Sequence, residues 1–138
     1  QGVSKWDAGA YSMSEAVKHD GKNTLEIDIV PRGGRCGVVI SYKKAQALFN
    51  KQGVKSVTFE FYYSVKDCEG VNYISLAYNG FQAAETDGAW HKYSVTLDAD
   101  ADYSAYFVLL LSYSDGSFSN RPMSGKIYIS PITYKCNY

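Results

Sequence analysis

A strand-like stretch, GAWHKYSVTL, carries a tryptophan on the face where polar residues are expected. Tyr93, Val95 and Leu97 share one parity of its alternation, whereas Trp90 and Lys92 share the other. Because successive side chains of a strand point to opposite faces, we expect the first set to face the core and the second to face away from it. A tryptophan on that outer face either closes the edge of a sheet or serves as a platform for a flat ligand.

Three further stretches with the same alternation extend this predicted outer face. Their outward parity carries aromatic rings and one carboxylate. These residues are Glu60 and Tyr62 in 56–64, Tyr73 in 71–78 and Tyr106 in 106–113. If the four strands are neighbours, the rings, the hydroxyls between them, one carboxylate and one ammonium share a single surface.

Aromatic rings interleaved with hydrogen-bonding groups suit the recognition of sugars. A pyranose ring has apolar C–H faces that stack on an aromatic ring, and a fringe of hydroxyls that bond to charged and amide groups. The predicted stacking platforms are Trp90 and Tyr73 first, then Tyr62 and Tyr106. Glu60 and Lys92 would bond to sugar hydroxyls, and Lys92 could alternatively meet a uronate carboxylate.

A second stretch offers the same chemistry at a loop. Tyr78, Asn79, Phe81 and Gln82 combine rings with amides around an Asn-Gly turn signal. A site at the loop end of the domain is therefore the alternative to a site on the sheet face. A plainer interpretation of the rings also stays open, because aromatic cross-strand pairs stabilise any antiparallel sheet.

The sequence offers no recognisable catalytic constellation. Glycoside hydrolysis needs two carboxylates held across a cleft, and Glu60 is the one strand carboxylate predicted on the outer face. The nucleophile-elbow pattern GxSxG is absent, so a serine triad built on His91 has no support. We expect a binding domain and not an enzyme.

Metal and cofactor motifs are absent from the sequence as well. Cys36, Cys68 and Cys136 form no CxxC pair, and His19 and His91 lack the spacing that would complete a zinc site. One disulfide with one free thiol would fit an exported protein, and three thiols would fit a cytosolic one. We expect no cofactor and no metal ion.

The composition indicates one globular domain over residues 1–138 and excludes two classes of partner. The 14 basic and 14 acidic residues balance, and no basic stripe of the kind that binds nucleic acid is present. The longest apolar stretch, YFVLLLSY, has the length of a strand and is too short to cross a membrane as a helix. We expect neither nucleic acid nor a membrane as partner, and we expect a monomer.

The dominant two-residue period predicts an all-β fold. The expected strands are 24–30, 36–42, 56–64, 71–78, 90–97, 106–113 and 126–134, and weaker candidates raise the number to between seven and nine. One-faced sheets must bury their apolar sides against each other, so an antiparallel β-sandwich of the jelly-roll type is predicted. A closed barrel is the alternative, because it needs the same alternation.

The stretches DGAWHKYSVTL and SGKIYISPITY resemble the G-x-W-x-x-Y-x-(V/F) and G-x-I-Y-I-D-N-I patterns of β-sandwich carbohydrate-binding modules. The resemblance extends loosely from KNTLEIDIV to the last predicted strand. It implies a non-catalytic module of a secreted enzyme that degrades plant cell-wall polysaccharide, or of a cellulosome component, tethered to a glycoside hydrolase domain. Many such modules hold a structural calcium through the Asp of that pattern. Ser130 and Pro131 stand there in this chain, so we do not predict that calcium site.

The prediction is therefore an extracellular module that binds a polysaccharide by aromatic stacking and hydrogen bonds. The balanced charge favours a neutral β-glucan or mannan. The alternative is a structural or adhesive β-sandwich of a cell-surface protein, which would share the alternation and the neutral charge.

Overall fold

A computed structural model describes residues 3–6, 10–33, 35–40, 47–69, 73–76, 79–99, 107–112 and 122–138. Within these ranges the chain forms eleven strands. They are β1 (Val3–Trp6), β2 (Ala10–His19), β3 (Lys22–Gly33), β4 (Arg35–Ile40), β5 (Ser56–Glu69), β6 (Tyr73–Leu76), β7 (Asn79–Ala83), β8 (His91–Asp98), β9 (Phe107–Ser112), β10 (Pro122–Ile129) and β11 (Thr133–Asn137).

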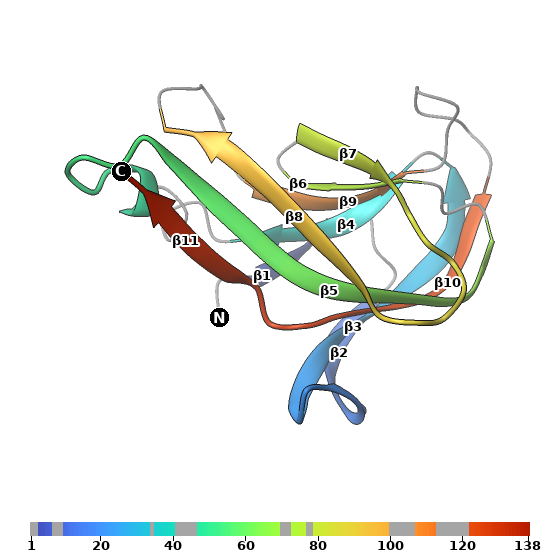
Figure 1. Cartoon of the computed structure of the whole chain (residues 1–138). Helices are drawn as coiled ribbons and strands as arrows, with labels where there is room; N and C mark the ends of the chain where they lie inside the picture. The colour runs from blue at the N-terminus through green and yellow to red at the C-terminus, as the bar shows by residue number, and fades with distance from the viewer. Residues whose placement is uncertain are drawn as a thin grey trace.

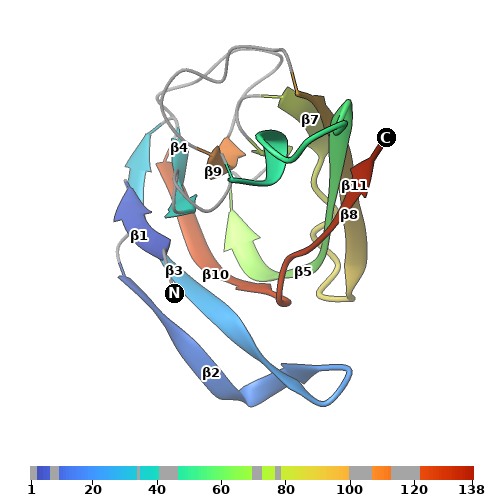
Figure 2. The same ribbon diagram turned by 90° about the vertical axis from the view of Figure 1, so that its left-hand side faces the viewer.

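The strands pair into two sheets (Figures 1 and 2). One sheet has the order β1-β4-β9-β6-β7. The other runs β11-β5-β10-β3-β2, with β8 paired to β5. Every pairing within both sheets is antiparallel. The predicted antiparallel β-sandwich is confirmed, and the barrel alternative is not the fold.

The core follows from the alternation of apolar residues along β5 and β8. In β5 the buried residues recur at every second position: Val57, Phe59, Phe61, Tyr63 and Val65. Tyr93 and Leu97 of β8 are buried beside them, and Ile74 of β6 joins the same cluster from the other sheet. Phe61 and Tyr93 are cross-strand partners whose rings stack at 4.8 Å. The two sheets thus share one apolar core.

Strand β5 is long enough to pair with two strands in succession along one edge. β10 pairs with its second half and β11 with its first half, while β8 runs along the opposite edge. The sequence predicted one strand over 126–134, but the pairing breaks after Ile129 and resumes at Thr133. Pro131 has no N–H to donate to a ladder, which favours a break at this point.

At this break Ser130 forms two hydrogen bonds with the backbone of β5. The Tyr62 N–H donates to Ser130 Oγ at 2.7 Å, and the Ser130 N–H donates to the Tyr62 carbonyl at 2.8 Å. Ser130 is 5% exposed, so water has little access to these groups. The residue that replaces the aspartate of the carbohydrate-binding-module pattern therefore holds β5 in register between its two partners.

The β2–β3 hairpin projects from the body of the sandwich (Figure 1). Its turn is Asp20-Gly21, with φ angles of 53° and 76°, as an Asp-Gly hairpin turn requires. The register shifts between Ser14 and Lys18, leaving a bulge in β2. The hydroxyl of the fully buried Thr24 donates to the Val17 carbonyl inside this bulge at 2.7 Å. Bulges bend and twist a hairpin, so this one sets the direction of the tip that carries His19.

Helical structure in the described part of the chain amounts to a single turn at 47–49. Leu48 of the turn is buried in the core, and the Phe49 ring lies 6.2 Å from that of Phe59. None of the described residues forms a helix of the length and apolarity that spanning a membrane requires.

Candidate functional site

The outer sides of β8, β5 and β11 form one continuous surface of polar residues, here called the polar face. Its members are the outward-pointing residues that the register sets side by side. They are Ser56, Thr58, Glu60 and Tyr62 of β5, Lys92, Ser94, Thr96 and Asp98 of β8, and Thr133, Lys135 and Asn137 of β11. Of these, Glu60, Tyr62 and Lys92 were predicted to face outward, and β11 extends that surface by a third strand.

Glu60 lies in the middle of the polar face. Its Oε2 is 3.4 Å from Lys92 Nζ on the neighbouring strand and accepts a hydrogen bond from Ser94 Oγ at the same distance. The Lys92 and Glu60 side chains are 50% and 40% exposed, so solvent screens this ion pair and it adds little to stability. Both charged groups are thus accessible to a ligand from solvent.

Hydroxyl and amide groups are ordered farther along the same face. The Thr58 and Thr96 hydroxyls are 2.8 Å apart and share a hydrogen bond. Asn137 Nδ2 donates to Thr58 Oγ1 at 3.1 Å and to Ser56 Oγ at 3.0 Å. Each hydroxyl can both donate and accept a hydrogen bond. These side chains can therefore accept a hydrogen bond from a ligand hydroxyl or donate one to it.

Three aromatic rings close one end of the polar face. The His19 ring stacks on Tyr62 at 4.5 Å with an angle of 25°, and Trp90 meets His19 edge-on at 4.8 Å. Tyr62 is 36% exposed, and Trp90 is half-buried. Trp90 is absent from the core cluster of the described residues. The structure therefore places it on the outer side of the sheet, packed against a ring from the hairpin tip.

Sequence reasoning did not include His19 in this cluster. His19 lies 43 residues before Tyr62 in the chain and comes from a strand that does not pair with β5. The Asp-Gly turn that follows it was a local signal for a hairpin. The bulge that turns the hairpin tip toward Tyr62 has no comparable signal, because it depends on the pairing of β2 with β3.

Tyr73 lies in the other sheet, away from the polar face. Its strand, β6, pairs with β7 and β9, and neither β6 nor β9 pairs with β5 or β8. The adjacent Ile74 is buried and Tyr73 is half-buried, as the parity predicted. The single surface expected from four neighbouring strands does not form, because the strands divide between two sheets. Tyr106 lies outside the described residues.

The predicted loop site falls largely in strand β7. Asn79 pairs with Leu76, so the Asn-Gly pair begins a strand where a turn was predicted. Gln82 lies opposite the buried Ile74 and donates from Nε2 to the Ser94 carbonyl at 2.9 Å. This hydrogen bond connects β7, at the edge of one sheet, to β8, at the edge of the other. The Gln82 amide therefore links the two sheets along this edge of the sandwich. Tyr78 lies outside the described residues.

Two cysteine side chains are described, and both are half-buried. Cys68 Sγ donates to the Lys126 carbonyl at 3.3 Å, and Cys136 is a free thiol. The Cys136 thiol lies beside the core on the inner side of β11, opposite Val57. Neither sulfur belongs to the polar face.

No protein-family model matches the sequence, and no curated protein matches it. Solved structures do match the fold. The CBM22-2 xylan-binding domain of Paenibacillus barcinonensis Xyn10C gives a TM-score of 0.60 at 10% identity, over 99% of this chain and 92% of that chain. The enzymatically active domain of tailspike protein 4 of bacteriophage CBA120 gives 0.54 at 10% identity, over 98% of this chain and 19% of that chain.

A third solved structure is the family 11 carbohydrate-binding module of Clostridium thermocellum in complex with a β-1,3-1,4-mixed-linked tetrasaccharide. It gives a TM-score of 0.48 at 12% identity, over 95% of this chain and 86% of that chain. At these identities the likeness concerns the fold. This chain shares the β-sandwich fold of the xylan-binding domain, as the sequence patterns predicted.

Proposed function

We propose that this domain is a non-catalytic carbohydrate-binding module that binds a polysaccharide along the polar face. The observation that carries the proposal is the three-ring cluster of His19, Tyr62 and Trp90 at the end of an open row of hydrogen-bonding groups. From Tyr62 to Ser56 this row extends about 20 Å at the usual rise of a strand, which is the length of several pyranose rings.

In this proposal the ring cluster stacks on a sugar, and the row of polar groups forms hydrogen bonds with the sugars that follow it. His19 covers one face of the Tyr62 ring, so the ring of Trp90 is the better platform for the apolar face of a sugar. Glu60 and Lys92 offer an acceptor and a donor to the hydroxyls of the next sugar along the chain. The exposed hydroxyl of Thr96 continues the same chemistry toward the far end.

A neutral, extended polysaccharide fits the charge of the polar face best. Glu60 and Asp98 are balanced there by Lys92 and Lys135. For a uronate-rich polysaccharide, repulsion by the two carboxylates would offset attraction by the two lysines. Neutral sugar hydroxyls, in contrast, can form hydrogen bonds with both the carboxylates and the ammonium groups. We favour a neutral plant cell-wall glucan or mannan, and the xylan-binding module of similar fold adds xylan to the candidates. Such a module would act in a secreted chain, tethered to a catalytic domain.

Affinity gel electrophoresis tests this proposal. The purified domain is run in gels containing mixed-linkage β-glucan, xyloglucan, glucomannan, xylan, starch or pectin. We expect retardation by a neutral polysaccharide and its loss in Trp90→Ala, since removal of a central aromatic contact costs about 1–3 kcal/mol of binding energy. Far-UV circular dichroism and thermal unfolding establish that the variant is folded.

Tyr134 supplies a matched control. It is an exposed ring, 53% accessible, on β11, where its parity sets it apart from the outward-pointing Thr133 and Lys135. Tyr134→Ala should leave the retardation unchanged. Absence of retardation by every polysaccharide would refute the proposal and favour the structural or adhesive sandwich. Equal losses in both variants would refute the placement of the site on the polar face.

A further inference from the structure

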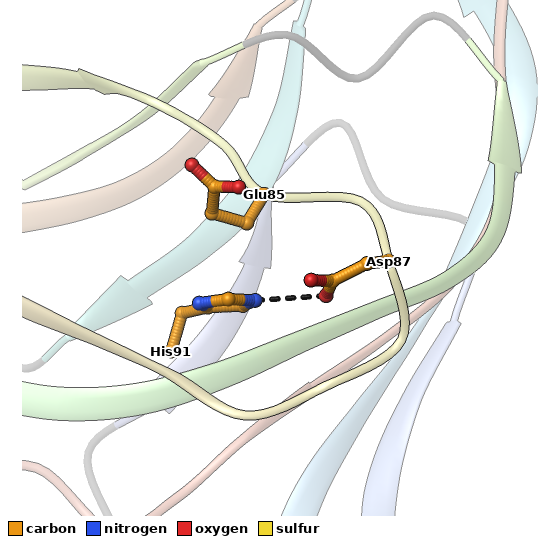
Figure 3. Close-up of side chains that lie close together, drawn as sticks. All are labelled: Glu85, Asp87 and His91. Carbon is orange, nitrogen blue, oxygen red and sulfur yellow. Dashed lines mark hydrogen bonds and ion pairs between the residues drawn. The ribbon is translucent and has the colours of Figure 1, made fainter.

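The loop between β7 and β8 gathers three side chains that can ligate a metal ion. Glu85, Asp87 and His91 place one carboxylate oxygen each from the two acids and one ring nitrogen within 4.8 Å of one another. Figure 3 shows the three side chains together at the loop, with His91 Nε2 2.8 Å from Asp87 Oδ1. The cluster is separate from the polar face and goes beyond the proposed polysaccharide site.

The backbone of this loop is fixed by strand β5. The Glu85 N–H donates to the Tyr63 hydroxyl at 3.0 Å. The Gly88 N–H donates to the Val65 carbonyl at 3.1 Å, and the Ser64 hydroxyl donates to the Gly88 carbonyl at 2.9 Å. Tyr63, Ser64 and Val65 are all buried. Little backbone entropy would therefore be lost when the three side chains close on an ion.

The charge of the cluster is unbalanced toward the negative. Two carboxylates face one imidazole, and among the described residues neither carboxylate forms an ion pair with a lysine or arginine. The Ala89 N–H donates to Asp87 Oδ1 at 2.9 Å, so the backbone of the loop orients this carboxylate.

We propose that Glu85, Asp87 and His91 bind a transition-metal dication of the Zn²⁺ class. An imidazole nitrogen with two carboxylate oxygens is a ligand set suited to Zn²⁺, whereas Ca²⁺ takes an all-oxygen shell. Binding replaces the Nε2–Oδ1 hydrogen bond: Nε2 gives its lone pair to the metal, and any proton it carries passes to solvent. Three protein ligands leave the remaining position to water.

The cysteine and histidine spacings typical of zinc sites do not identify this site. Two of its three ligands are carboxylates, and only one is a histidine. The pattern in the chain is Glu-x-Asp-x-x-x-His. The bound ion would link the start of the loop to the start of β8, across the segment that contains Trp90. The loop would then be held at both ends, by β5 and by the metal.

Isothermal titration calorimetry of the purified domain with ZnCl₂ tests the proposal. We expect one Zn²⁺ per chain with a micromolar Kd, and a loss of affinity of at least tenfold in both Glu85→Gln and His91→Ala. CaCl₂ should give no comparable binding. A matched control is His19→Ala, which removes the other histidine of the chain and should bind Zn²⁺ like the wild type.

The two site variants keep the result interpretable. His91 is half-buried and its ring lies 6.0 Å from that of Tyr63, so its removal can loosen the loop. Glu85 is exposed, and Glu85→Gln removes the charge while keeping the shape. No saturable Zn²⁺ binding by the wild type overturns the proposal. Undiminished binding by Glu85→Gln and His91→Ala, or its loss in His19→Ala, overturns the assignment of these residues.

Discussion

Replacing Ser130 by alanine should destabilise the domain by about 2 kcal/mol. The substitution removes the acceptor of the Tyr62 N–H, which sits at 2.7 Å from Ser130 Oγ in a site that is 5% exposed. A buried donor left without a partner costs about 1–3 kcal/mol. We take the middle of that range, because the Tyr62 carbonyl keeps its bond from the Ser130 N–H.

Urea unfolding followed by tryptophan fluorescence measures this effect. With a slope of about 2 kcal/mol per molar urea, the midpoint of Ser130→Ala should fall by about 1 M at unchanged slope. Ser94→Ala is the control, because the exposed Ser94 hydroxyl reaches Glu60 Oε2 at 3.4 Å. It should shift the free energy of unfolding by no more than about 0.5 kcal/mol. Equal midpoints for Ser130→Ala and the wild type would refute the role assigned to this hydroxyl.

Two further substitutions test the packing and the hairpin. Phe61→Ala should lower the free energy of unfolding by about 3–5 kcal/mol. Phe61 is 1% exposed and stacks on Tyr93, so its removal leaves a cavity. A urea midpoint close to that of the wild type would contradict this. Gly21→Ala should lower the free energy of unfolding, measured by thermal unfolding, by about 1 kcal/mol. The φ of 76° strains an alanine, but its Cβ would meet no atom within 4 Å, so no steric clash adds to this loss. A much larger loss would mean that the turn packs against other residues.

The sequence predicted the two faces of the sheet residue by residue where one face is buried. The alternation of Phe59, Glu60, Phe61 and Tyr62 decides which side chains enter the core, because the period of a strand is fixed by its covalent geometry. Tyr93 and Lys92 follow the same rule on β8. The β5 and β8 parts of the polar face were therefore predictable from the alternation alone.

Strand neighbours were not predictable in the same way. Tyr73 was expected near Tyr62 because both have outward parity, but the parity of a strand does not say to which sheet it belongs. His19 reaches Tyr62 through a bulge and a turn, features that arise from pairing between strands. Likewise, the division of the last predicted strand at Ser130 follows from β5 offering one edge to two partners.

The polar face also constrains the order in which the domain folds. Ser94 meets Glu60 across 34 residues of chain, whereas Thr133 meets Glu60 across 73 and Asn137 meets Ser56 across 81. Pairings that close such long loops are slow, and folds dominated by them form in milliseconds to seconds. The shorter loop between β5 and β8 closes at the lower entropic cost. A refolding chain should thus pair β5 with β8 before β11 completes the polar face.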